Sequence, residues 1–262
     1  MANNEVGPSG SSSPPPLSPS QKRVIKNTNA SITLRPEHYP PPPELCVIGY
    51  YLLNCPLLHA LIAFTTVPEE TLIKAFESNV NLNPTAHHAD SDRQVQFSFT
   101  DSRGVQHMII ITRELFASIL QLPTNVSYRL PKNEIGPFIR ILADLPPEAH
   151  ASLKTRHSQL IPYWQFLAMV IQRAFFGQCG NKPEGKIDLW PVLYGIYMNT
   201  ETDYLSIIWN DFIYYLKKPA SIRYSRWWSL YLSHFFNEMC PLHIPSSSRS
   251  STYLTFLNNA KI

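Results

Sequence analysis

The stretch from Val95 to Pro123, VQFSFTDSRGVQHMIIITRELFASILQLP, changes its apolar spacing partway along and thereby limits how this chain can fold. Apolar and polar residues alternate over residues 95–100, which predicts a strand with one buried face. Residues 105–111 predict its antiparallel partner, and Gly104 suits the left-handed position of the turn between them. The stretch therefore begins as a β-hairpin.

A helix is expected directly after the hairpin. Thr112 can cap it, and Glu114 lies in the first turn, where the positive end of the helix dipole favours a carboxylate. Its apolar residues recur at helical spacing and are expected to fold back over the hairpin: Leu115, Phe116, Ile119 and Leu120. On this interpretation the stretch is scaffold and not a reactive site.

From Ser158 onward the apolar spacing is helical. Pro162 can open a helix that Gly177 ends, with a shared apolar face made of Trp164, Leu167, Ile171, Ala174 and Phe175. Helices are also expected over 189–198 and from about Arg223 to Asn237. The clearest pattern lies between them, at Leu205, Ile208, Trp209, Phe212, Ile213 and Leu216, with Lys217 and Lys218 in the last turn.

Composition sets the domain limits. Residues 1–43 hold ten of the 24 prolines and few large apolar side chains, so they predict a disordered arm. Residues 44–244, in a chain that is 44% hydrophobic and 12% aromatic, predict one mainly α (α+β) globular domain of several helices with a single antiparallel hairpin near 95–111. Residues 245–262 form a Ser-rich tail.

The uncharged stretch 45–68 includes CVIGYYLLNCPLLHALIAF, which is long enough to cross a bilayer. Asn54, Pro56 and His59 interrupt it, and no basic flank orients it, so two short buried helices are the favoured interpretation. No hydrophobic leader follows Met1, and the sequence favours a cytoplasmic or nuclear protein without membrane contact. The four cysteines, Cys46, Cys55, Cys179 and Cys240, are expected to be reduced, buried thiols.

Three motifs resemble catalytic or metal sites, and each has a structural alternative. Cys179 follows a predicted helix C-terminus, where the dipole disfavours a thiolate nucleophile. The Asp-Ser-Gly motif of aspartic proteases is interrupted by an arginine in Asp101-Ser102-Arg103-Gly104. This segment is instead predicted to form the hairpin turn. Cys240 with His243, and His87 with His88, lack zinc-finger spacing. We therefore predict no enzyme, no catalytic residue, no metal and no cofactor.

One basic and aromatic cluster remains, formed by Lys217, Lys218, Arg223, Arg226 and Trp227. Cations interleaved with aromatic rings can hold a single nucleic-acid strand by phosphate pairing and base stacking. A helix end followed by a helix that buries its Trp side chains explains the same residues and is preferred. The net charge of +3 gives no support to a polyanion partner.

The order of several segments resembles a plant retrotransposon-associated domain family, the Gag-side or putative plant transposon proteins. The segments lie between about Leu45 and Phe236 and are CVIGYYLLNCPLLHALIAF, the hairpin and helix ending SILQLP, LIPYWQFLAMVIQRAFFG, TDYLSIIWNDFIYYL and IRYSRWWSLYLSHFF. The family's last motif has Pro before an Arg-aromatic pair, where this chain has Ser225. The resemblance implies an element-encoded, Gag-like setting and carries over no catalytic residue.

Together these observations predict a non-enzymatic assembly or protein-interaction domain derived from a retrotransposon. Its expected partners are further copies of itself or other element-encoded proteins. The alternative is a module of a transposable-element polyprotein that binds single-stranded nucleic acid through the 217–228 cluster. That alternative predicts salt-sensitive binding weakened by Arg226→Ala.

Overall fold

The computed structural model describes residues 47, 51–52, 54–62, 81–83, 94–100, 104–176, 185–217, 235 and 239. Within them the chain forms a mainly α domain with one antiparallel hairpin, as predicted. The elements in chain order are α3 (Leu58–Ile62), β1 (Asn81–Asn83), β2 (Gln94–Thr100), β3 (Gln106–Ile111), α5 (Arg113–Leu120), α6 (Lys132–Leu142), the 3-10 turn η2 (His157–Gln159), α7 (Pro162–Phe175), α8 (Leu189–Met198) and α9 (Tyr204–Leu216).

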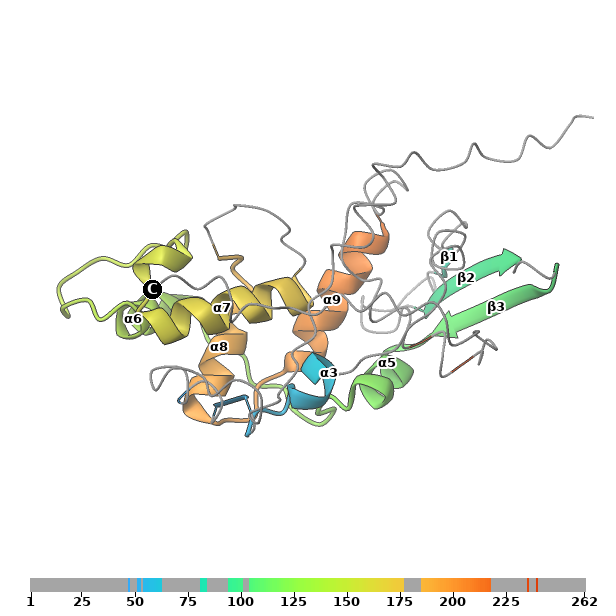
Figure 1. Ribbon diagram of the computed structural model, residues 1–262, viewed down its shortest axis with the longest axis horizontal. Coiled ribbons are helices and arrows are strands. Elements are labelled where there is room, and N and C mark those ends of the chain that lie inside the picture. Colours follow the sequence, from blue (N-terminus) through green and yellow to red (C-terminus); the bar gives the residue numbers. More distant parts are fainter. Residues whose placement is uncertain are drawn as a thin grey trace, which may run out of the picture.

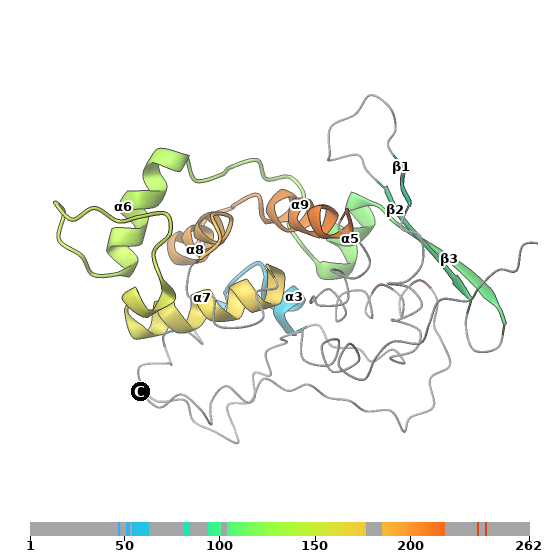
Figure 2. The ribbon, with the colours of Figure 1, turned by 90° about the horizontal axis from the view of Figure 1, so that it is seen from above.

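The helices form one body, and the small sheet extends from one end of it (Figure 1). α8 packs against both α6 and α7, while α5 packs against α9 nearer the sheet (Figure 2). α9 lies in the middle of the body in both views. The two regions on either side of α9 are therefore an α6–α7–α8 region and an α5–sheet region.

The sheet has the strand order β1-β2-β3, with both pairs antiparallel. Val95 pairs with Ile111 and Phe97 with Ile109, and all four side chains are buried on one face. Gly104 has φ +80°, as the turn required, and a Cβ there would touch nothing, so its role is conformational. Residues 101–103 of the turn lie outside the described residues.

α5 begins where the sequence predicted. The Thr112 hydroxyl oxygen accepts the Leu115 N–H at 3.1 Å, and Gln121 ends the helix in a left-handed conformation at φ 50°. Phe116 is fully buried, and its ring lies 5.1 Å from that of Trp209 and 5.3 Å from that of Phe212. The sequence predicted that the apolar face of α5 folds back over the hairpin. It did not predict that this face also packs against α9.

The two predicted helices of the C-terminal half are present at 162–175 and 189–198, and the third spans Tyr204–Leu216. Pro162 occupies the first turn of α7, and the predicted face of that helix is buried. Phe235 and Met239 are helical, the latter two residues beyond the predicted end of the last helix. The remainder of that helix, Gly177, the N-terminal arm and the Ser-rich tail lie outside the described residues.

α6 was not predicted from the sequence. Its buried residues Ile135, Phe138, Ile139 and Leu142 follow i, i+3, i+4, i+7, a helical signal that Gly136 and Pro137 obscure. Pro137 lies in the middle of α6 but on its exposed face, where water can satisfy the Asn133 carbonyl that loses its partner.

The stretch 45–64 is broken near Pro56, as the sequence suggested. Val47, Tyr51 and Leu52 are helical, residues 54–57 form turns, and α3 follows. Leu57, Ala60 and Leu61 are fully buried in the core. Among the described helices, none has the length and apolar character needed to cross a membrane.

Candidate functional site

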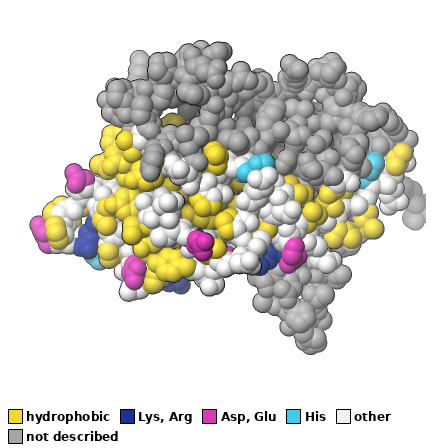
Figure 3. Space-filling view, turned by 90° about the horizontal axis from the view of Figure 1, so that it is seen from below, with side chains coloured by type: hydrophobic (Ala, Val, Ile, Leu, Met, Phe, Trp, Pro, Cys, Tyr) yellow, Lys and Arg dark blue, Asp and Glu magenta, His cyan; other side chains and the backbone are white. Residues whose placement is uncertain are grey.

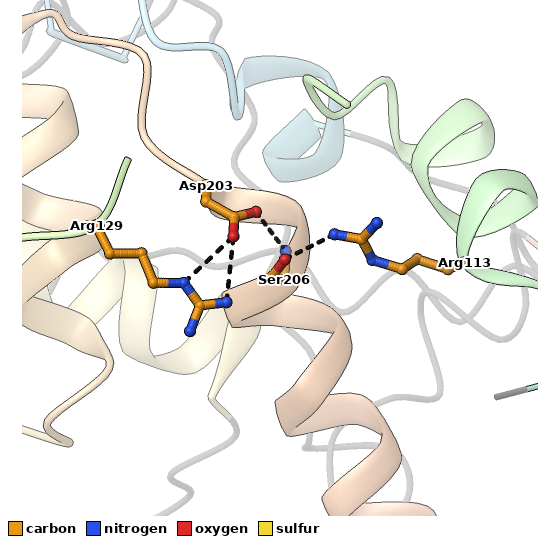
Figure 4. A network of polar contacts seen from close by, with 4 residues as sticks. All are labelled: Arg113, Arg129, Asp203 and Ser206. Atoms are coloured by element: carbon orange, nitrogen blue, oxygen red, sulfur yellow. Dashed lines mark hydrogen bonds and ion pairs between the residues drawn. The ribbon is translucent and has the colours of Figure 1, made fainter. Parts of the chain in front are cut away.

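The N-terminus of α9 is the centre of a polar network (Figure 4). Asp203 caps the helix by accepting the Ser206 N–H at 3.0 Å. Its other carboxylate oxygen accepts two hydrogen bonds from the Arg129 guanidinium, each at 3.2 Å. Arg113 on α5 donates to the Ser206 hydroxyl at 2.6 Å. The network therefore ties α5 and the 121–131 connection to the start of α9.

The same network fixes the backbone next to Arg129. The Asp203 N–H donates to the Tyr128 carbonyl at 2.9 Å, so both Tyr128 and Arg129 are held by one residue. The Tyr128 ring is 41% exposed, and the Arg129 side chain is 47% exposed. The Tyr128 ring and the Arg129 guanidinium are therefore exposed to solvent on a segment whose backbone is held by Asp203.

Tyr128 is one end of a run of tyrosine rings that we term the aromatic surface: Tyr51, Tyr128, Tyr163, Tyr194 and Tyr197. The rings of Phe138 and Trp164 lie buried beneath them. The ring contacts, at centroid separations between 5.2 and 6.2 Å, join Tyr128 with Tyr194, Tyr194 and Tyr197 with Phe138, and Tyr197, Tyr51 and Tyr163 with Trp164.

The spacing of the helices produces this arrangement. Tyr194 and Tyr197 are three residues apart on α8 and so share a face, while Trp190, Leu193 and Ile196 are buried. Four of the five tyrosines are half-buried and Tyr128 is exposed. Seen from below, hydrophobic side chains cover much of the described surface, and charged groups stand isolated between them (Figure 3).

Within the aromatic surface, the Tyr128 hydroxyl holds its proton more tightly than an ordinary phenol. Desolvation, and then a hydrogen bond with the Tyr194 side chain, raise the pKa of Tyr128 above its ordinary value. The negative charge of the Glu134 carboxylate also raises the pKa of Tyr128. A neutral phenol can both donate and accept hydrogen bonds, so the surface combines apolar rings with polar tips.

Lys186 forms a second, more enclosed ionic contact. Its ammonium donates to the Asp211 carboxylate at 2.6 Å and lies 5.6 Å and 5.3 Å from the ring centroids of Phe176 and Tyr215. The contact joins the segment before α8 to the end of α7 and to α9. Because the charge is paired and covered by rings, we assign Lys186 a structural role.

The Tyr204 hydroxyl and the Cys55 thiol are two ionisable groups of the core that burial keeps protonated. The Tyr204 hydroxyl and the Thr202 hydroxyl lie against Gly195 of α8. Burial raises the pKa of the Cys55 thiol to about 12, and burial also raises that of Tyr204. Cys55 is a free, buried thiol, as expected from the sequence.

The sequence-predicted nucleic-acid residues are only partly described. Lys217 was predicted in the last turn of the helix; it is instead the C-cap residue directly after α9, and it is exposed. Lys218, Arg223, Arg226 and Trp227 lie outside the described residues, and so does Cys179. Single-strand binding by this cluster stays a prediction. In the parts of the chain that the structure describes, no group of three His, Cys, Asp or Glu side chains could hold a metal ion.

Sequence reasoning missed the aromatic surface. Tyr194 and Tyr197 carried a signal, because their i, i+3 spacing lies in a helix that was predicted with the correct bounds. Tyr128 carried none, since it lies in an irregular connection whose position depends on Asp203, 75 residues further along the chain. Only the fold brings these rings together.

No family model, no curated protein and no solved structure matches this sequence. The resemblance to plant retrotransposon-associated proteins therefore stays a prediction from the ordered segments. The geometry of the described residues is the remaining basis for a function.

Proposed function

We propose that this domain is a non-enzymatic assembly or protein-interaction module that uses the aromatic surface as its contact face. The observation that carries the proposal is the run of partly exposed tyrosine rings from Tyr51 to Tyr128 over buried Phe138 and Trp164. Tyrosine is enriched at protein interfaces because one ring supplies a large apolar area together with a hydrogen-bonding tip. On the resemblance alone, we place the module in a retrotransposon-derived protein.

The rings are held in place before any partner arrives. Tyr194 and Tyr197 are on a regular helix, and Tyr128 is fixed through its carbonyl to Asp203. Side chains that are already ordered lose little conformational entropy on association. Such rigid aromatic groups are the type of residue that contributes most to binding energy.

The chemistry of the described core agrees with a non-enzymatic role. The Cys55 thiol is buried, and its pKa of about 12 keeps it protonated and unsuited to act as a nucleophile. The buried His157 ring is paired at 2.9 Å with the Gln172 side chain. Both groups are used for packing and for satisfying buried polar atoms.

Analytical ultracentrifugation over a wide concentration range tests the proposal. We expect the mass of the wild-type chain to rise with concentration and the double variant Tyr128→Ala/Tyr194→Ala to stay monomeric. Tyr214→Ala is the matched control, since Tyr214 is 52% exposed on α9 and lies outside the aromatic surface. Wild-type protein that remains monomeric at the highest concentration would refute assembly.

A further inference from the structure

We infer that the aromatic surface binds a proline-rich segment in the polyproline II conformation, namely residues 40–43 with their flanks from a second copy of this chain. The inference rests on the function proposed above and specifies the partner of that surface. Its three supports are the chemistry of the rings, the position of the proline tract in the chain and the symmetry of the exchange.

The chemistry of the surface matches this ligand. Polyproline II has three residues per turn and no internal hydrogen bonds, so its carbonyls remain free to accept. Domains that recognise it dock proline rings on aromatic side chains, because the preformed helix loses little entropy on binding. Here Tyr194 and Tyr197 lie one helical turn apart, and Tyr128 contacts Tyr194 at 6.2 Å between centroids. The rings of Tyr128, Tyr194 and Tyr197 can therefore serve as adjacent contact sites for successive prolines.

The polar groups around the rings suit the free carbonyls of such a ligand. The Tyr128 phenol stays protonated, because its pKa is raised, and can donate. Arg129 uses Nε and one terminal nitrogen for Asp203, and its second terminal nitrogen makes no contact among the residues drawn in Figure 4. Arg129 could also pair with Glu44, which follows the last proline of the tract.

The proline tract is close in sequence to a residue of the aromatic surface. Pro40–Pro43 ends four residues before Val47, which is helical and exposed, and eight before Tyr51. Four residues span at most about 14 Å of extended chain. Tyr51 belongs to the aromatic surface through its contact with Trp164 at 5.2 Å. Each chain therefore carries the ligand sequence within a few residues of the surface that can receive it.

Two copies related by a two-fold axis could exchange their tracts. A two-fold interface repeats every contact, so each surface would receive the tract of the other copy. The second contact would then form at a high effective concentration and strengthen the first. We commit to a second copy because this exchange yields the self-association proposed above.

A complementation experiment with full-length chains tests the inference. One variant replaces Pro40, Pro41, Pro42 and Pro43 by Ser and keeps the surface. The other, Tyr128→Ala/Tyr194→Ala, keeps the tract. We expect each variant alone to sediment as a monomer and an equimolar mixture to form a heterodimer, more weakly than wild type because only one of the two contacts survives.

A peptide of residues 36–45 with a fluorescent label provides a direct readout. Its fluorescence anisotropy should rise with the Pro→Ser chain, and at least tenfold less with the Tyr→Ala chain. The same peptide with serine in place of each of Pro40, Pro41, Pro42 and Pro43 is the control ligand. Tyr128→Phe/Tyr194→Phe, checked by circular dichroism, replaces the alanine pair if that pair unfolds; it should weaken binding by removing the hydroxyls only.

The outcomes separate the inference from the proposed function. A Pro→Ser chain that self-associates like wild type would overturn the inference and leave the interaction module intact. A wild-type chain that stays monomeric would overturn both. Peptide binding that is equal for the Tyr→Ala chain and the Pro→Ser chain would place the ligand elsewhere and overturn the inference.

Discussion

Two groups of aromatic rings in this domain are built from similar residues and differ in what surrounds them. Phe116, Trp209, Phe212 and Phe235 form a buried aromatic cluster between α5 and α9, and each of the four is fully buried. The aromatic surface lies on the other side of α9, over α7 and α8, and its tyrosines are half-buried or, for Tyr128, exposed. The comparison suggests that the first group stabilises the fold and the second makes contacts.

The largest expected effect is the loss of a ring from the buried aromatic cluster. Trp209 lies 5.1 Å from Phe116 and 5.7 Å from Phe212, between centroids. Trp209→Ala should lower the free energy of unfolding by about 3–5 kcal/mol, because it removes apolar contacts and leaves a cavity. Urea unfolding followed by circular dichroism measures this change.

Tyr214→Ala is the control on the same helix. Its side chain is 52% exposed, and the expected change is within about 0.5 kcal/mol. Equal losses for the two variants would contradict the assignment of the buried aromatic cluster to stability.

Gly195→Ala tests how closely α8 approaches the start of α9. A Cβ at Gly195 would overlap the Tyr204 and Thr202 hydroxyls and would lie 2.8 Å from the Thr202 Cβ. We expect a loss of about 1–3 kcal/mol from overpacking, measured by urea unfolding. Gly136→Ala on α6 is the control, because its Cβ would meet only a carbonyl at an ordinary 3.6 Å. It should be neutral or slightly stabilising.

The Cys55 thiol should make stability depend on alkaline pH. Burial raises its pKa to about 12 in the folded protein, against about 8.5 in an unfolded chain. Between these values only the folded state keeps the proton, so stability is complete below about pH 8.5 and falls as pH rises. The slope for one group approaches about 1.4 kcal/mol per pH unit.

Cys55→Ala isolates this contribution. Unfolding free energies measured between pH 8 and 9.5 should fall more steeply for the wild type than for the variant. The window stays below the range in which the tyrosines of the unfolded chain titrate. Parallel curves would show that the thiol is solvated in the folded state.

The sequence predicted the elements whose signals are local. The hairpin, the Thr112 cap and the bounds of α7 and α8 follow from alternation, capping and helical spacing within each segment. α6 was missed because Gly136 and Pro137 interrupt its pattern, although its buried face is regular. The aromatic surface depends on contacts between α6, α7, α8 and the 121–131 connection. Spacing along one element cannot report such contacts.

Apart from the control variants, the smallest expected change in stability comes from Asp203, which connects the two regions through α9. Asp203→Ala removes the helix cap and the partner of Arg129, so the free energy of unfolding should fall by about 1 kcal/mol. Asp203→Asn keeps a cap oxygen and should lose less. If self-association requires Asp203 to hold the segment that carries Tyr128, Asp203→Ala should also weaken the concentration-dependent increase in mass seen by sedimentation. Unchanged self-association with lowered stability would show that α9 fixes the fold while the aromatic surface binds independently of it.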